Sequence, residues 1–189
     1  MPKVVDHDAR RETLAATAAR VIAERGVENT RLRDVARQAG FSTSIVGHYF
    51  NNKDALILSA LDYVDRQVAS RFAKLRNRSI KQALETILPL DDERRMEWRV
   101  RINFWGRATV QPELARSLAE SLAYSQQTMA HILGEQIEQG TIRRDIDIDS
   151  TAESLVNASM SLSVRVLFQP DVYSKGVVSE RIERLLALI

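Results

Sequence analysis

The sequence predicts an all-α protein of about nine helices, and three observations support this fold class. Apolar residues recur at spacings of three and four along most of the 189-residue chain, which is the period of one helix face. Only seven glycines and four prolines interrupt the chain, and they fall between these apolar stripes. The one stretch that alternates polar and apolar residues, 144–149, is too acidic and too isolated to pair as a strand.

The first helix is predicted over about 9–25. Its apolar residues share one helical face, and Gly26 can end it in the left-handed conformation that helix C-termini favour. These apolar residues are Leu14, Ala18, Val21 and Ile22.

Two short helices joined by a glycine turn follow the first. Thr30 is a good N-cap for the second helix, and Gly40 stops it. Ser42 caps a third helix that runs through Phe50. Both caps carry a hydroxyl, which can accept a hydrogen bond from a free N–H group of the first helical turn.

The spacing across this pair indicates a helix-turn-helix motif. Ala36 is small where two crossing helices need a small side chain, and Gly40, four residues on, suits a tight turn. Val46 places an apolar side chain at the same contact between the two helices, which we call the seam. A plain helical hairpin in a bundle, with no role in DNA binding, has the same local pattern, so the spacing alone leaves both interpretations open.

Six more helices are predicted in the rest of the chain. Ser79 caps the fifth, Asp91 suits the positive N-terminus of the sixth, and Asp149 or Ser150 caps the eighth. Pro112 lies in the first turn of the seventh, where proline is favoured. The predicted ranges are about 52–75, 79–88, 91–109, 112–139, 150–169 and 174–189, with a break at 77–79 between the first two.

Composition limits the class of protein. The formal net charge is only +2, but residues 1–53 hold nine Lys and Arg against six Asp and Glu, a modest positive excess where the motif lies. The absence of cysteine excludes disulfides, thiolate metal sites and cysteine nucleophiles. No apolar run reaches membrane length and no signal-peptide pattern is present, so we expect a cytoplasmic protein with no membrane partner.

Exposed positions around the third helix are candidates for contact with DNA. The recognition helix of such a motif offers its N-terminal residues to base edges in the major groove. Here the residues that face away from the core are Thr43, Ser44, Gly47 and His48. Free N–H groups at the helix starts near Thr30 and Ser42 can meet phosphates, and the candidate side-chain phosphate ligands are Arg31, Tyr49 and Lys53.

The stretch 30–56 resembles the DNA-binding domain of the TetR/AcrR repressors, and the order of nine helices and the chain length agree with that family. Many members carry Tyr where this chain has Gly47. The subgroup like the choline-responsive repressor BetI has a small residue there, within a similar Ser-Thr-x-x-x-x-His-Tyr-Phe run. The resemblance to this subgroup continues over 103–112.

The resemblance implies a DNA-binding transcriptional repressor with two domains. Residues 1–53 would form the helix-turn-helix domain, and residues 54–189 would bind a small-molecule effector of unknown identity and form a homodimer. Effector binding would change the separation of the two recognition helices and release the protein from a palindromic operator in double-stranded DNA.

The eighth helix is apolar on two faces, so both must be covered. One face would pack against the core of the domain. The other face, together with the last helix, would pack against a partner subunit. Burial of both faces within one chain is the alternative on pattern alone, and the family resemblance favours the dimer. The predicted interface residues are Leu155, Ala158, Leu162, Val166, Ile182, Leu185 and Leu186.

Aromatic and methionine residues cluster in the middle of the chain and are candidates for a ligand cavity. Trp and Tyr faces can bind a cation. Aromatics at helical spacing are also common in cores, which is the alternative interpretation. The predicted pocket residues are Met96, Trp98, Phe104, Trp105, Tyr124, Met129 and Asn157.

Other patterns do not support an enzyme or a metal site. Asp145, Asp147 and Asp149 have the spacing of a calcium loop, but its sixth and twelfth positions hold Ser150 and Val156 instead of Gly and Glu. The histidines lack partners at ligand spacing, and neither a phosphate-binding glycine loop nor a nucleophile elbow is present. We therefore expect no metal, no cofactor and no enzyme activity. The alternative function is a helical protein-binding module without sequence-specific DNA binding.

Overall fold

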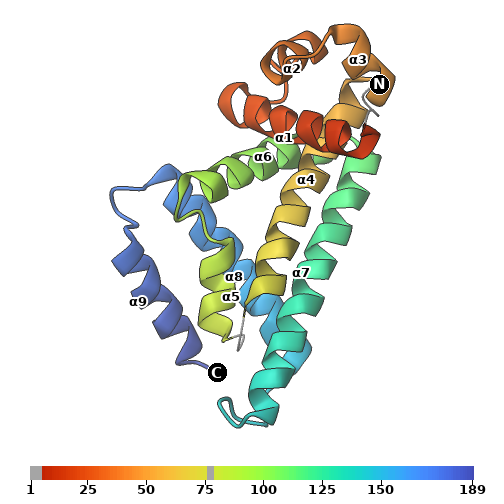
Figure 1. Cartoon of the computed structure of the whole chain (residues 1–189). Coiled ribbons are helices and arrows are strands. Elements are labelled where there is room, and N and C mark those ends of the chain that lie inside the picture. Colours follow the sequence, from red (N-terminus) through yellow and green to blue (C-terminus); the bar gives the residue numbers. More distant parts are fainter. Residues whose placement is uncertain (1–5, 76–78) are drawn as a thin grey trace. The chain divides into compact units, whose positions relative to one another are not determined.

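The computed structural model describes residues 6–75 and 79–189, and over these residues the fold is all-α (Figure 1). The described part contains nine helices and no strand, which confirms the predicted fold class. The helices are α1 (His7–Arg25), α2 (Leu32–Ala39), α3 (Thr43–Tyr49), α4 (Lys53–Lys74), α5 (Ile80–Ile87), α6 (Asp92–Ala108), α7 (Pro112–Glu138), α8 (Ile148–Phe168) and α9 (Lys175–Leu186).

Several helix ends lie where the sequence predicts them. The Oγ of Ser42 accepts the N–H of Ile45 at 3.2 Å, and the Oγ of Ser79 accepts the N–H of Gln82 at 3.2 Å. Gly40 ends α2 with a φ of 73°, the left-handed conformation that glycine adopts without a Cβ clash. These three boundaries therefore follow from local sequence.

The predicted N-cap of α2 is wrong. The cap is Arg31 rather than Thr30, and it makes no side-chain cap hydrogen bond. The hydroxyl of Thr30 donates instead to the carbonyl oxygen of Gly26 at 2.8 Å, four residues back. Thr30 thus completes the end of α1 and not the start of α2.

The predicted N-cap of α8 is also wrong. The carboxylate of Asp147 accepts the N–H of Ser150 at 3.0 Å, so α8 begins at Ile148 and both predicted caps, Asp149 and Ser150, lie within its first turn. A carboxylate one residue before a helix satisfies a free N–H group and favours the positive helix end. The predicted break at 77–78 lies outside the described residues.

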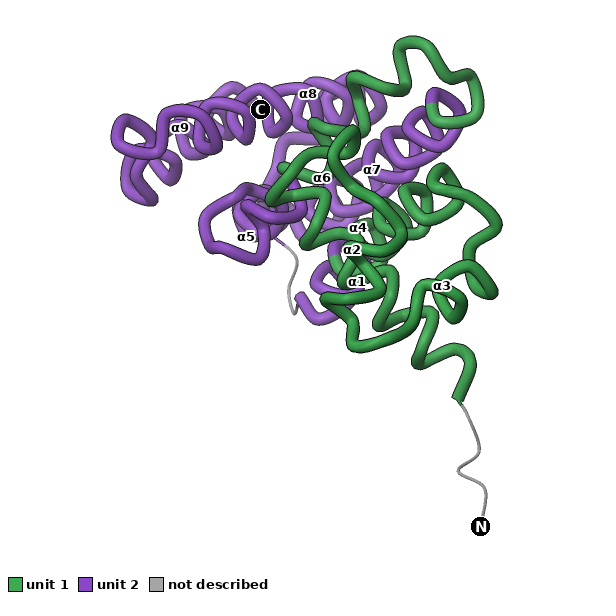
Figure 2. Tube along the Cα trace, turned by 90° about the horizontal axis from the view of Figure 1, so that it is seen from above, with its two compact units in different colours: residues 1–67, 99–114 green, residues 68–98, 115–189 purple. Residues whose placement is uncertain are grey.

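The chain divides into two compact units, which Figure 2 colours separately. The first comprises residues 1–67 and 99–114, and the second comprises residues 68–98 and 115–189. Helices α4, α6 and α7 contribute to both units, because each crosses a unit boundary along the chain. The predicted domain boundary after residue 53 stays a prediction.

The first unit has a hydrophobic core. Within it α1 packs against α2, and α2 packs against α3. The side chains of this core that are at most 1% exposed include Leu14, Ile22, Val35, Val46, Phe50, Leu56 and Ile57. Burial of such side chains is the main favourable contribution to folding.

The second unit is built around a separate hydrophobic cluster. Helix α9 packs against α5, and the Lys81 ammonium on α5 pairs with the Glu183 carboxylate on α9. The cluster draws on α5, α7, α8 and α9 and includes Leu84, Leu88, Met129, Ile132, Leu133, Leu155, Val166 and Ile182.

Two kinds of feature are absent from the described residues. No described helix combines the length and apolar character needed to cross a bilayer. Among the same residues, no group of three or more His, Cys, Asp or Glu side chains is arranged to hold a metal ion.

Candidate DNA-binding surface and effector site

Helices α2 and α3 pack around a small apolar seam. Val35, Ala36 and Val46 are at most 2% exposed. Across the turn, the N–H of Phe41 donates to the carbonyl oxygen of Ala36 at 2.9 Å. The two helices and their left-handed glycine turn therefore form the helix-turn-helix that the sequence predicts.

One side of α3 is buried and the other is open to solvent. Val46 fills the seam, and Phe50, directly after the helix, is 1% exposed. The residues on the opposite side are all exposed, and they are Thr43, Ser44, Gly47 and His48. The four predicted groove-facing residues thus share one open face, and their contact with DNA stays a prediction.

Two of the predicted phosphate ligands flank this face. Arg31 is exposed directly before α2. The hydroxyl of Tyr49 is 2.8 Å from Nδ1 of His7, so a hydrogen bond joins the start of α1 to the end of α3. Tyr49 is half-buried, and this bond orients its hydroxyl at the surface.

Two more of the positions predicted to contact phosphate, Thr30 and Lys53, are engaged within the protein. Thr30 is fully buried, and its N–H donates to the carbonyl oxygen of Val27 at 3.2 Å. The hydroxyl and the N–H of Thr30 are thus both hydrogen-bonded within the protein, and the predicted phosphate contact near Thr30 stays a prediction. The ammonium of Lys53 donates to the carbonyl oxygen of Glu28 at 3.0 Å and so supports the turn between α1 and α2.

Two arginines of α1 that the sequence analysis does not single out lie beside the same motif. Cζ of Arg10 is 5.8 Å from the ring centre of Phe41, and Cζ of Arg11 is 5.9 Å from that of Phe50. A guanidinium over an aromatic face is attracted to its negative quadrupole. Both rings belong to residues that flank α3, so no local spacing in the sequence indicates these contacts.

Helix α6 holds the turn that follows α1 within the first unit. The side-chain oxygen of Asn103 accepts the N–H of Val27 at 3.2 Å. Arg107 pairs with Asp54 at 2.9 Å and lies 4.0 Å from a carboxylate oxygen of Glu28. A hollow of about 520 Å³ lies between this turn and α6. The segment that precedes the helix-turn-helix is therefore hydrogen-bonded to α6.

Three of the predicted pocket residues are buried. Met129 belongs to the hydrophobic cluster of the second unit. Trp98 is 5% exposed, and its Nε1–H donates to the carbonyl oxygen of Ile87 at 2.6 Å. Phe104 is buried in the first unit. These environments are those of core residues.

The other predicted pocket residues lie nearer the surface. Tyr124 is 57% exposed, and Asn157 is exposed on α8. Met96 and Trp105 are half-buried. The seven residues thus occupy different environments, and the suggestion that they line one cavity stays a prediction.

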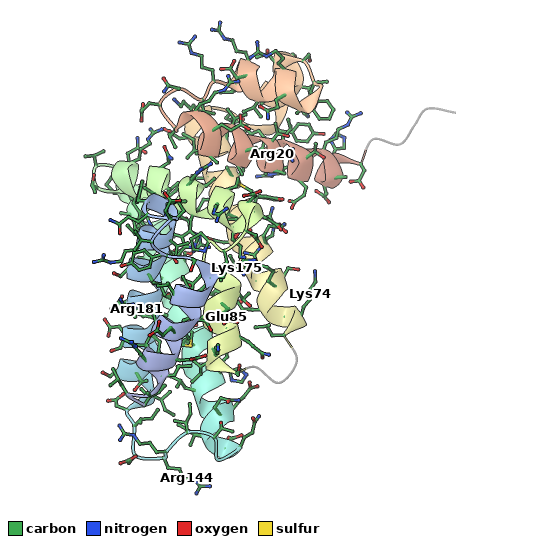
Figure 3. The ribbon with its side chains drawn as sticks, turned by 90° about the vertical axis from the view of Figure 1, so that its left-hand side faces the viewer. Arg20, Lys74, Glu85, Arg144, Lys175 and Arg181 are labelled. Carbon is green, nitrogen blue, oxygen red and sulfur yellow. The ribbon has the colours of Figure 1, made fainter. Side chains whose placement is uncertain are left out.

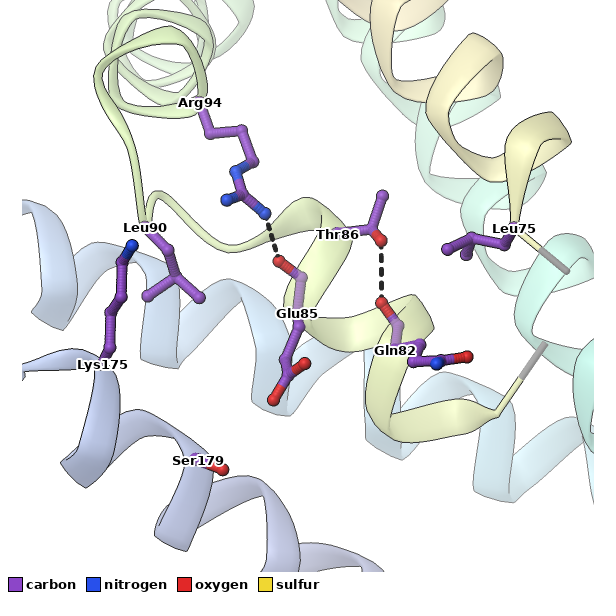
Figure 4. Close-up of a pocket in the computed structure, with 8 residues that line it drawn as sticks. All are labelled: Leu75, Gln82, Glu85, Thr86, Leu90, Arg94, Lys175 and Ser179. Carbon is purple, nitrogen blue, oxygen red and sulfur yellow. Dashed lines mark hydrogen bonds between the residues drawn. The ribbon is translucent and has the colours of Figure 1, made fainter. Parts of the chain in front are cut away.

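A hollow of about 520 Å³ opens in the second unit between α5, α9 and the start of α6 (Figure 4). Glu85 extends toward α9, and Lys175 reaches back from α9, so opposite charges border the hollow (Figures 3 and 4). Arg94 is neutralised by the Asp91 carboxylate, 2.9 Å away. None of the predicted pocket residues is among its walls, which are Leu75, Gln82, Glu85, Thr86, Leu90, Arg94, Lys175 and Ser179.

A second hollow of the same unit, of about 430 Å³, lies between α8 and α9. Arg165 donates to the hydroxyl of Tyr173 at 3.2 Å, which fixes one end of its wall. Apolar and basic side chains alternate along it, and the lining residues are Ala158, Ser161, Leu162, Arg165, Tyr173, Arg181 and Leu185.

The predicted dimer-interface residues lie in two environments. Leu155, Val166 and Ile182 are each 1% exposed in the hydrophobic cluster of their own chain. The interface itself stays a prediction. The other predicted interface residues are half-buried, and they are Ala158, Leu162, Leu185 and Leu186.

Family models match most of the chain. Residues 14–60 match the model described as bacterial regulatory proteins, tetR family, and residues 76–189 match that of the BetI-type transcriptional repressor, C-terminal. The chain is 27% identical to the HTH-type transcriptional regulator PksA of Bacillus subtilis, over 98% of this chain and 90% of that protein. It is 32% identical to BetI of Stenotrophomonas maltophilia over 61% of this chain and 63% of that protein.

Solved structures resemble the chain over nearly its whole length. A transcriptional regulator from Rhodococcus is 26% identical, with a TM-score of 0.82 and coverage of 95% of both chains. A transcriptional regulator from Saccharomonospora viridis, solved in complex with choline, is 27% identical with a TM-score of 0.83. That match covers 95% of this chain and 96% of the other.

Proposed function

The chain belongs to the tetR family of DNA-binding transcriptional regulators, with a BetI-type C-terminal part, and on this premise we propose that it is a repressor controlled by a small molecule. It would bind a palindromic operator as a homodimer in the cytoplasm and leave the operator when an effector binds the second unit. Its relatives are regulators, and this confirms the prediction that the chain is not an enzyme.

The exposed face of α3 is the observation that carries the proposal. Thr43, Ser44 and His48 offer hydroxyl and imidazole groups to base edges, and a two-fold dimer presents two such faces to half-sites about 34 Å apart. Arg31 and Tyr49 are proposed to contact phosphates, which position the protein without reading sequence. Lys53 is proposed to act indirectly, by supporting the turn before α2.

Operator binding should be specific and strongly dependent on salt. A duplex selected by the protein from a random library should show two-fold symmetry, and binding should weaken about 10³-fold between 50 and 200 mM salt because several phosphates are neutralised together. The measurement is fluorescence anisotropy on the selected duplex and on a scrambled duplex of the same length. Equal affinity for the two would exclude a sequence-specific repressor and favour the helical protein-binding module.

Two single variants should distinguish residues that read bases from residues that contact phosphates. His48→Ala should weaken the selected duplex about tenfold and leave the scrambled duplex unchanged, because a base contact is lost. Arg31→Ala should weaken both duplexes alike and reduce the salt dependence, because a phosphate contact is lost. The same two duplexes measure both variants. If His48→Ala weakened both duplexes equally, the base-reading role of His48 would be wrong.

Choline is the first effector to test, because a solved relative contains it. Among the aromatic residues predicted for the pocket, Tyr124 is exposed and lies in the second unit, and an aromatic face can bind a quaternary ammonium through cation–π attraction. We expect choline to raise the Tm of the free protein and to weaken its binding to the selected duplex. No change in either measurement at millimolar choline would show that the effector belongs to another chemical class.

A further inference from the structure

Nothing in the structure of the chain requires a glycine at position 47. Its backbone lies inside α3, and the glycines that need a positive φ are elsewhere, at Gly26, Gly40 and Gly140. A Cβ placed on Gly47 meets no atom within 4 Å. Glycine is among the least favourable residues inside a helix, and α3 has only seven residues. An alanine at this position would fit and would stabilise α3.

The place of Gly47 on α3 indicates what a side chain there would cover. The Cα–Cβ bonds of a helix tilt toward its N-terminus, so a side chain lies over the turn before its own Cα. For position 47 that turn carries Thr43 and Ser44, which are both exposed. Gly47 therefore leaves two hydroxyls and the adjoining helix backbone open, with the exposed His48 at their border.

We propose that Gly47 is a specificity-determining position, where the missing side chain forms a notch that admits the edge of one base pair to Thr43 and Ser44. The inference rests on the operator binding proposed above. Hydroxyl groups can donate to or accept from base edges in the major groove, and a threonine methyl can contact the methyl of thymine. Both side chains are short, so they reach a base only if the helix backbone approaches the groove closely.

Gly47→Ala tests the notch, with Gly106→Ala as its matched control. Gly106 is also exposed inside a helix, and a Cβ placed on it meets no atom within 4 Å. Both variants should therefore fold, and both should show a raised Tm. Each is measured with the duplex that the wild-type protein selects and with a scrambled duplex of the same length.

We expect Gly47→Ala to bind the selected duplex about tenfold more weakly than the wild type and the scrambled duplex equally well, because only base contact is lost. Gly106→Ala should match the wild type on both. Unchanged or tighter binding of Gly47→Ala to the selected duplex would contradict the proposed notch. An equal loss of affinity for both duplexes would contradict it as well. A wild-type protein that did not prefer its selected duplex would instead refute operator binding itself, and the notch with it.

Discussion

Replacing Arg71 by alanine should lower the free energy of unfolding by about 3–5 kcal/mol, because it removes a charged, bidentate hydrogen-bond partner from a buried carboxylate. The side chain of Glu97 on α6 is only 3% exposed, and that of Arg71 on α4 is 23% exposed. Nη1 of Arg71 donates to Oε1 of Glu97 at 2.7 Å, and Nη2 donates to the other carboxylate oxygen. The pair is therefore bidentate, which is the strongest arrangement of these two groups.

The electrostatics of Arg71 agree with this expectation. Burial by itself would lower the pKa of Arg71, but the hydrogen bond and charge of Glu97, together with the charges of Glu93 and Asp91, raise the pKa above its ordinary value. Arg71 therefore stays charged at every pH at which the protein is handled. The stability that the pair contributes should not depend on titration of the arginine.

Chemical denaturation measures the loss, and thermal unfolding should show a Tm lower by about 6–20 °C for a chain of this length. Arg66→Ala is the matched control on the same helix. Arg66 pairs with Glu12 and Asp62 at the surface, where its side chain is 46% exposed, so its loss should cost less than about 1 kcal/mol. The double variant Arg71→Met with Glu97→Leu should recover most of the stability, since no buried charge remains. A cost for Arg71→Ala no larger than that of Arg66→Ala would contradict the buried pair.

The helix order and the exposed face of α3 could be predicted because both depend on local sequence. Ser42, Ser79 and Gly40 act on groups within a few residues, so their roles follow from residue type and position. The exposure of Thr43 and His48 follows from the helical period once Val46 is assigned to the seam. Local rules fail where two partners compete for one side chain, as at Thr30, whose hydroxyl donates to the carbonyl oxygen of Gly26 instead of capping α2.

The contacts between helices could not be predicted in the same way. Arg71 and Glu97 lie on different helices, and nothing in their local spacing pairs them. The two apolar stripes of α8 were both visible in the sequence. Which residues face the core depends on where α9 packs, so the sequence alone could not show that Leu155 and Val166 lie in the hydrophobic cluster of their own chain.

Ser161→Arg should separate the proposed dimer and weaken operator binding about 10³-fold, to the level of non-specific binding. Ser161 is exposed in the hollow between α8 and α9, which already holds Arg165 and Arg181. A third arginine on each copy would bring unpaired like charges into an interface, where their desolvation is costly. A single subunit would then meet only one half-site, since the second recognition helix is no longer attached.

The mass of the variant in solution, from light scattering, and its affinity for the selected duplex test both parts of this prediction. Ser70→Arg is the control, because it makes the same change at an exposed serine of α4. Arginine is a good helix former, so both variants should keep the helical content of the wild type. A dimeric Ser161→Arg protein with wild-type affinity would show that the interface lies elsewhere. A wild-type protein that binds its selected duplex as a monomer would show that operator recognition does not need the dimer.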